Sequence, residues 1–231
     1  TSLSPGTDYH FRILAFDLLG NATKTSDNLF STSVEAENVV ISEIKTAGSG
    51  GADDEWIELY NPTDLPVDLS GWSIQYRGGE GESFYKKNFT STSTIPAKGF
   101  FLIANSSYSG GVVPDMNYTA FKMSADGGNI FLVKSHDYLT SATSSLIIDK
   151  LSYGGGSNLF PEGEAAMAPT TNESLERKAS ATSTASLLVN GLHQWLGNSY
   201  DTDRNNFDFV IQDNPNPQNS LMLSEPRNNL P

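Results

Sequence analysis

Apolar and polar side chains alternate in short segments along most of this chain, and this pattern limits its possible folds more than any other feature. In residues 55–61 (EWIELYN), Ile57 and Leu59 fall on one face of a strand, and Glu58 and Tyr60 on the other. Similar segments are separated by turns rich in glycine, proline and asparagine, and they cover 39–46, 71–78, 98–105, 128–135 and 145–154. The pattern predicts an all-β protein in which two sheets face each other as a sandwich.

Helical periodicity is scarce in the sequence. Only residues 184–196 (TASLLVNGLHQWL) have the length and apolar spacing of a short helix, and Gly191 weakens that prediction. Residues 205–212 (NNFDFVIQ) are predicted as the last strand. The polar, proline-containing segment after Gln212 is expected to be loop and tail.

The acidic residues around the segment 55–61 raise the question of catalysis. Asp53, Asp54, Glu55 and Glu58 are close in sequence, but acid–base catalysis needs two carboxyls that converge across a cleft. Glu58 lies opposite the apolar face of its strand, so we expect an exposed or rim carboxylate. We therefore interpret these acids as structural groups and predict that the chain is not an enzyme.

Other catalytic and cofactor-binding patterns are missing from the sequence. The three histidines, His10, His136 and His193, share no metal-binding or catalytic spacing, and no Gly-x-Ser-x-Gly motif is present. The glycine clusters at 48–51 and 78–81, like a third at 153–157, lack the arrangement that binds phosphate ahead of a helix. We predict no catalytic residue and no cofactor-binding residue.

Charge and cysteine content exclude further classes of function. The 27 acidic residues outnumber the 14 basic ones, giving a net charge of −13, which disfavours binding to nucleic acid. The absence of cysteine excludes disulfides, thiolate metal sites and cysteine nucleophiles, and it favours a prokaryotic origin. No apolar run is long enough to span a bilayer. The first residues are typical of the middle of a domain, so we expect the chain to be part of a longer protein.

The strongest candidate for a ligand site is the segment DTDRNNFD at 201–208. Asp201, Asp203 and Asn205 occupy positions one, three and five of a calcium-binding loop, and Asp208 follows closely. Position six is asparagine instead of glycine, and position twelve is Gln212 instead of glutamate. The alternative is a turn in which Asp and Asn side chains bond their own backbone before the last strand. Calcium is the only cofactor that the sequence suggests.

Aromatic residues in or near the loops suggest a second possible ligand. Such rings can stack against sugar rings, although several of them must cover the edges of the sandwich. A glycan partner would then contact some of Tyr76, Phe84, Tyr85, Phe89, Tyr108 and Tyr118.

Residues 1–33 resemble the last two strands of a fibronectin type III domain. The matching residues are PGT at 5–7, Tyr9 at the tyrosine-corner position, and Ala15, Asp17, Gly20 and Asn21. A hairpin alone cannot bury its apolar face. We therefore expect it to dock on the following domain or on another molecule.

An ordered series of motifs in the rest of the chain resembles the bacterial lamin tail domain. These motifs are ISEI (41–44), DEWIELYNPT (54–63), VDLSGWSI (67–74), IPAKGFFLIAN (95–105), DGGNIFLV (126–133), DKLSYG (149–154), SLERK (174–178), DTDRNNFDF (201–209) and PNPQN (215–219). The resemblance implies an immunoglobulin-like β-sandwich within a large secreted or cell-surface protein. The predicted organisation is a hairpin at 1–33, a linker at 34–38, the sandwich at 39–220 and a tail at 221–231.

The function that this resemblance implies is non-catalytic. We expect a spacer, adhesion or display module that presents loops or an edge strand to a protein or to a cell-surface glycan. The alternative is a calcium-stabilised or glycan-binding module that targets an enzyme located elsewhere in the full-length chain. The sequence leaves the partner, the oligomeric state and the host organism open.

Overall fold

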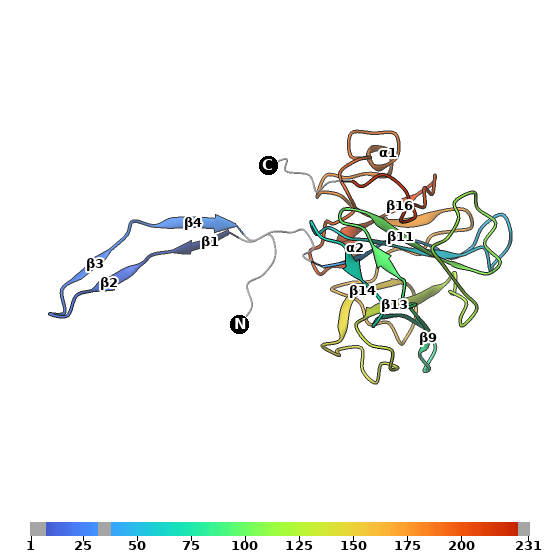
Figure 1. Cartoon of the computed structure of the whole chain (residues 1–231), viewed down its shortest axis with the longest axis horizontal. Coiled ribbons are helices and arrows are strands. Elements are labelled where there is room, and N and C mark those ends of the chain that lie inside the picture. Colours follow the sequence, from blue (N-terminus) through green and yellow to red (C-terminus); the bar gives the residue numbers. More distant parts are fainter. Residues whose placement is uncertain (1–7, 32–37, 226–231) are drawn as a thin grey trace.

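Two facing β-sheets form the centre of the fold, as the alternating pattern predicts. The computed structural model describes residues 8–31 and 38–225. The larger sheet has six strands in the order β12-β11-β6-β5-β15-β16, and the smaller has four in the order β14-β13-β8-β9 (Figure 1). Neighbouring strands are antiparallel except for the parallel pair β11 and β12. The architecture is an immunoglobulin-like β-sandwich.

The strands are short, as in most sandwiches. The six-stranded sheet contains β5 (Val40–Lys45), β6 (Trp56–Tyr60), β11 (Phe100–Asn105), β12 (Met116–Tyr118), β15 (Ser174–Arg177) and β16 (Phe209–Gln212). The four-stranded sheet contains β8 (Ser73–Gly78), β9 (Tyr85–Asn88), β13 (Gly127–Val133) and β14 (Ile147–Gly154). A separate two-stranded ribbon pairs β7 (Val67–Asp68) with β10 (Thr94–Ile95).

The main core lies between the two sheets and is built by the inward side of the alternation. Ile57 and Leu59 of β6 face this core, as the pattern predicts. They are joined from the other strands by Ile41, Ile44, Ile74, Tyr76, Ile103, Ile130, Leu132, Leu151, Tyr153 and Leu175.

A bulge in β5 lets two residues three positions apart face the same core. Ile41 pairs with Leu59 and Ile44 pairs with Ile57, while the register shifts between Ile41 and Glu43. The additional residue is Ser42. Inserting one residue turns the following side chain to the opposite face, so Glu43 points to the outer side of the sheet.

The outer face of the six-stranded sheet is buried, contrary to our expectation of a solvated face. Trp56 packs there with Leu102, and Tyr60 packs with Phe100. Glu58, between Trp56 and Tyr60, is buried as well, so the prediction of an exposed or rim carboxylate is wrong. The face is covered by a segment after β16, residues 213–225, which we call the C-terminal strap. Part of this strap falls in the tail predicted at 221–231.

Three hydrogen bonds show how the strap is attached. The Glu225 amide donates to the Lys98 carbonyl oxygen (2.7 Å), and the Tyr60 hydroxyl donates to the Glu225 carbonyl oxygen. The side-chain amide of Asn219 donates to the carbonyl oxygen of Val113 (2.9 Å). The strap is therefore bonded to the sandwich along its length and belongs to the fold.

A buried ion pair joins the two sheets. Nη2 of Arg177 on β15 lies 2.9 Å from Oδ2 of Asp149 on β14, and both side chains are buried. The same Asp149 oxygen accepts a bond from the Ile41 amide (2.6 Å), and Arg177 Nε donates to the Ile41 carbonyl oxygen (2.9 Å). Burial raises the pKa of Asp149 to about 6, although Arg177 acts in the opposite direction, so the carboxylate is ionised at neutral pH.

Residues 8–31 form a twisted hairpin of β1 (Asp8–Phe11), β2 (Leu14–Phe16), β3 (Ala22–Lys24) and β4 (Asn28–Ser31). Strand β1 pairs with β4, and β2 pairs with β3. Phe11, Ile13, Phe16 and Leu19 are exposed, so the sandwich, one of the two predicted docking partners, does not cover these apolar side chains. Docking on another molecule stays a prediction. The other predicted hairpin residues, and linker residues 34–37, lie outside the described residues.

The helix predicted at 184–196 is much shorter in the structure. Helix α1 covers Ala185–Leu188, and a Cβ on Gly191 would lie 2.4 Å from the Ser186 carbonyl oxygen, so the chain turns back tightly there. Helix α2 (Asn205–Asp208) occupies the first half of the strand predicted at 205–212, and only the second half is β16. Neither helix of the described residues has the length and apolar character needed to cross a membrane.

The buried ion pair yields a stability prediction. Arg177→Ala leaves the Asp149 charge buried without its partner, and we expect a loss of about 3–5 kcal/mol in the free energy of unfolding. Urea denaturation followed by tryptophan fluorescence measures the loss. Arg12→Ala is the matched control, because the Arg12–Asp27 pair is exposed and should contribute little. Equal stability of the two variants would contradict the role that we assign to Arg177.

Candidate functional site

Three glutamates lie side by side across neighbouring strands on the covered outer face. Glu43 of β5 pairs with Glu58 of β6 on one side and with Glu176 of β15 on the other. All three are buried, and a fourth buried glutamate, Glu225, reaches them from the strap. We call these four residues the glutamate row. Like charges placed directly opposite in a sheet repel each other, so this arrangement needs neutralisation.

Each carboxyl of the row accepts hydrogen bonds from neutral neighbours. The hydroxyl of Ser42 donates to Glu58 (2.6 Å), and that of Ser174 donates to Glu43. Glu176 accepts from Gln212 Nε2 (2.8 Å) and Asn198 Nδ2 (3.1 Å), and Glu225 accepts from Gln218 Nε2 (2.8 Å). No ion pair connects the row to a basic side chain within residues 8–31 and 38–225.

Burial favours the protonated, neutral form of each carboxyl in the glutamate row. Burial, together with the neighbouring carboxyls Glu176 and Glu58, raises the pKa of Glu43 well above its usual value. Burial likewise raises the pKa of Glu58 strongly, and it raises the pKa values of Glu176 and Glu225 to about 7 despite their hydrogen bonds. The row therefore holds protons at neutral pH that the unfolded chain releases.

The acids that raised the question of catalysis are structural acceptors. Glu55 is buried and accepts bonds from Asn105 Nδ2 (3.1 Å), the Tyr118 hydroxyl (3.0 Å) and the Met123 amide (2.7 Å). Burial raises the pKa of Glu55 to about 7, and these three donors act in the opposite direction.

Asp54 and Asp53 have partners of their own. Asp54 fixes two loops by accepting from the Ser109 amide (2.9 Å) and the Gly50 amide (3.1 Å). Asp53 pairs with Lys122 at the surface. The Asp54 carboxylate borders a pocket that also contains Lys45, but its bonds to both loops hold it in place.

The structure brings together two of the four predicted calcium ligands. Carboxylate oxygens of Asp201 and Asp203 lie within 4.8 Å of each other and of Glu162, which the sequence analysis did not select. Asn205 instead accepts from the Ser152 amide (2.9 Å). Asp208 accepts from the Thr202 hydroxyl (2.6 Å) and the Arg204 amide (3.0 Å). Asn205 and Asp208 thus bond inside the fold, and calcium binding itself stays a prediction.

The acidic group at Glu162 has the electrostatic character of a cation site. Burial, with contributions from Asp149 and Asp201, raises the pKa of Glu162 to about 8. Asp203 has a left-handed backbone (φ 55°) and its amide donates to Asp201 (3.3 Å), which is the Asx turn considered as the alternative. Asp201 also lies 3.3 Å from Arg177, so this cation competes with a metal for the same carboxylate.

The remaining candidate residues divide between surface and core. His10 bonds to Asp27 in the hairpin, and His193 bonds to Ser183, so two of the three histidines serve local contacts. His136 is exposed. Of the six aromatic residues proposed for sugar stacking, Tyr76, Phe89 and Tyr118 are buried, Phe84 and Tyr108 are half-buried, and only Tyr85 is exposed (49%).

Sequence reasoning missed the glutamate row, although a signal for it existed. Glu43, Glu58 and Glu176 each follow or precede inward-facing apolar residues in the segments ISEI, WIELY and SLER. Alternation places Glu58 and Glu176 on the outer face, whereas Glu43 reaches it only through the bulge at Ser42. The burial of that face depends on the strap, which comes from a segment without any strand pattern.

Comparisons with known proteins agree with this architecture. The family model Lamin Tail Domain matches residues 32–155. Among solved structures, the chain is similar to a DUF4876 family protein from Bacteroides thetaiotaomicron, with a TM-score of 0.52 and 11% identity over 96% of this chain and 85% of that one. At this identity the likeness shows the fold alone. No curated protein sequence matches the chain.

The glutamate row predicts that the protein becomes less stable as the pH rises. Its carboxyls bind protons more tightly in the folded chain than in the unfolded chain. Their stabilisation is thus complete below about pH 4.5 and is lost as the pH rises through about 7. For Glu225 alone, a shift from 4.5 to about 7 corresponds to on the order of 3 kcal/mol. Thermal denaturation should give a higher Tm at pH 5 than at pH 8.

Matched variants separate the row from the other acids. The double variant Glu176→Gln/Glu225→Gln replaces two titrating carboxyls by neutral amides, so its Tm should depend less on pH. Glu82→Gln changes an exposed glutamate and should keep the full dependence. A wild-type Tm that is flat or rises between pH 5 and pH 8 would show that the row does not hold protons.

Proposed function

Because the chain belongs to the lamin tail domain family, we propose that it is a non-catalytic module of a larger secreted or cell-surface prokaryotic protein. Its role in this proposal is that of a spacer or display unit, which holds loops and edge strands where a partner reaches them. The observation that carries the proposal is the use of the buried acids. Glu55 and the glutamate row accept bonds from fixed neutral donors, as structural carboxyls do. Among the described residues, Glu225 borders a pocket whose lining contains no second acid.

In this proposal, residues 1–33 are the last hairpin of a fibronectin type III domain that precedes the sandwich. The turn of the described hairpin supports this assignment. Asp17 accepts bonds from the amides of Leu19 (2.9 Å) and Asn21 (2.8 Å), and Gly20 has the left-handed backbone (φ 85°) of such a turn. The exposed apolar face of the hairpin would then be covered by the rest of that domain.

A second candidate function is a calcium-stabilised module, and the grouping of Glu162, Asp201 and Asp203 favours it. The sandwich would then gain rigidity where the loop 201–204 meets the segment around Glu162. Oxygen ligands of this type are the ones that calcium prefers. The ligand set differs from the one predicted from spacing, because Glu162 takes the place of Asn205 and Asp208.

The non-catalytic role can be tested with chromogenic substrates. The purified chain should release no p-nitrophenol from p-nitrophenyl phosphate, bis-p-nitrophenyl phosphate or p-nitrophenyl glycosides beyond the rate in buffer. Glu55→Gln is the diagnostic variant, because Glu55 belongs to the acids first considered for catalysis and burial raises its pKa to about 7. Turnover by the wild type that disappears in this variant would refute the proposal.

The surface location can be tested on cells that produce the full-length protein. Protease added to intact cells should remove the module from the surface, while a cytoplasmic marker protein survives. Protection of the module until the cells are lysed would contradict a secreted or surface location.

The calcium hypothesis predicts a shift in thermal stability. Millimolar Ca²⁺ should raise the Tm, because a ligand that binds only the folded state stabilises it. Asp203→Asn removes one negative charge from the ligand set and should reduce the shift, whereas Asp64→Asn alters an exposed acid elsewhere and should preserve it. An unchanged Tm with millimolar calcium, measured at pH 9 where Glu162 is largely ionised because its pKa is about 8, would exclude the site.

A further inference from the structure

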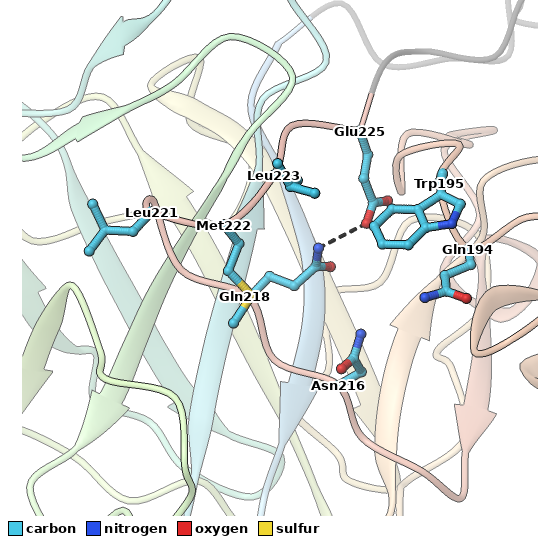
Figure 2. A pocket seen from close by; sticks show the side chains of 8 residues that line it. All are labelled: Gln194, Trp195, Asn216, Gln218, Leu221, Met222, Leu223 and Glu225. Atoms are coloured by element: carbon cyan, nitrogen blue, oxygen red, sulfur yellow. Dashed lines mark hydrogen bonds between the residues drawn. The ribbon is translucent and has the colours of Figure 1, made fainter.

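A pocket of about 410 Å³ lies where the strap meets the segment after helix α1 (Figure 2). This volume falls within the roughly 300–1,000 Å³ that is typical of small-molecule sites. The segment after α1 supplies Gln194 and Trp195 to the lining. The strap supplies the remaining lining residues, which are Asn216, Gln218, Leu221, Met222, Leu223 and Glu225.

Trp195 is exposed in a protein whose other tryptophans are buried. Its exposed fraction is 54%, against 1% for Trp56 and 8% for Trp72. The indole combines a large apolar face with one polar N–H group, so an exposed tryptophan in a concave site is a typical recognition residue. Figure 2 shows Trp195 and Glu225 among the side chains that line the pocket.

Amide groups surround the same space. Gln218 donates to Glu225 (2.8 Å), and the Gly197 amide also donates to Glu225 (3.2 Å), so this polar pair is fixed. The side-chain amides of Gln194 and Asn216 make no hydrogen bond within the described part of the chain, and Figure 2 shows them in the pocket wall. Each free amide offers two donors and one acceptor to a ligand.

The combination of one exposed indole with free amides fits a particular ligand chemistry. A sugar ring has an apolar C–H face that packs on an aromatic ring and hydroxyls that both donate and accept hydrogen bonds. We propose that this pocket binds a neutral saccharide, with one sugar ring lying on Trp195 and its hydroxyls bonded by Gln194 and Asn216. The inference rests on the proposed role as a non-catalytic interaction module and gives that module its ligand class.

Other occupants fit the pocket less well. An apolar side chain from a protein would pack on Trp195 and Leu223 but would leave the amides of Gln194 and Asn216 without partners, which is costly on burial. A nucleic acid is disfavoured by the net charge of −13. A neutral saccharide satisfies both the apolar and the polar parts of the lining.

Two steps test the proposal on the whole chain. First, the labelled chain is applied to an array of neutral oligosaccharides, and at least one compound should be bound. Second, that compound is titrated against the chain while acrylamide quenching of tryptophan fluorescence is recorded. Because Trp56 and Trp72 are buried, quenching reports mainly on Trp195, and the bound sugar should protect it.

Variants assign the binding to this pocket. Trp195→Ala should weaken affinity by roughly tenfold or more, as expected for a tryptophan anchor. Gln194→Ala removes a group that bonds nothing in the described chain, so it should weaken binding several-fold without loss of stability. Tyr85→Ala is the control, because Tyr85 is the exposed member of the aromatic set first suspected of sugar binding.

The results that overturn the proposal are distinct from those that overturn the non-catalytic role. A silent array, or binding that Trp195→Ala leaves unchanged, refutes the saccharide site and leaves the chromogenic assays and the surface location untouched. Sedimentation that shows a dimer lost in Trp195→Ala, without sugar binding, identifies a second copy as the occupant. Mass spectrometry of the bound sugar completes the test, because a cleaved product would refute the non-catalytic role instead.

Discussion

Placing carboxyl groups side by side on a buried sheet face is the constraint on which the rest of this structure depends. Glu43, Glu58 and Glu176 occupy paired positions on three neighbouring strands, where ionised groups would repel each other. The fold provides neutral donors, excludes water with the strap and retains protons. The strap and the segment after α1 both supply donors to this row, through Gln218 to Glu225 and through Asn198 to Glu176.

The sandwich uses a different solution for the buried acid between its sheets. Asp149 is paired with Arg177 and with backbone amides, so its charge is kept and balanced. Removing one partner of such a pair is costly, which ties the two sheets to each other. The outer face therefore depends on protons and the inner contact on an ion pair. The stabilisation from the glutamate row and that from the Asp149–Arg177 pair therefore depend on pH in different ways.

Much of the sandwich could be predicted from the sequence because period-two alternation reports directly on the core. Ile57, Leu59, Ile74 and Ile130 all face the interior for this reason. Alternation does not report what covers the opposite face, so Glu58 was wrongly expected at the surface. The strap has no periodicity of its own, and its packing depends on side chains that are distant in sequence.

The sequence also suggested two groups of ligand-binding residues that the structure only partly brings together or exposes, the calcium ligands and the aromatic residues near loops. Asn205 and Asp208 fit the spacing of a calcium loop, but the turn of α2 directs them to the Ser152 amide and to the Thr202 hydroxyl. Aromatic residues near loops looked exposed, yet Tyr118 stacks on Phe121 inside the core. Trp195 was assigned to a helix that ends at Leu188, so its exposure and its pocket could not be anticipated.

The central claim is that the buried glutamates hold protons at neutral pH instead of acting as exposed or catalytic carboxylates. The most direct measurement is the pH titration of glutamate side-chain carboxyl carbons by ¹³C NMR, with signals assigned through Glu→Gln variants. The account predicts that Glu43, Glu58, Glu176 and Glu225 titrate well above 4.5, with Glu176 and Glu225 near 7. Titration of all four at or below 4.5 would contradict it.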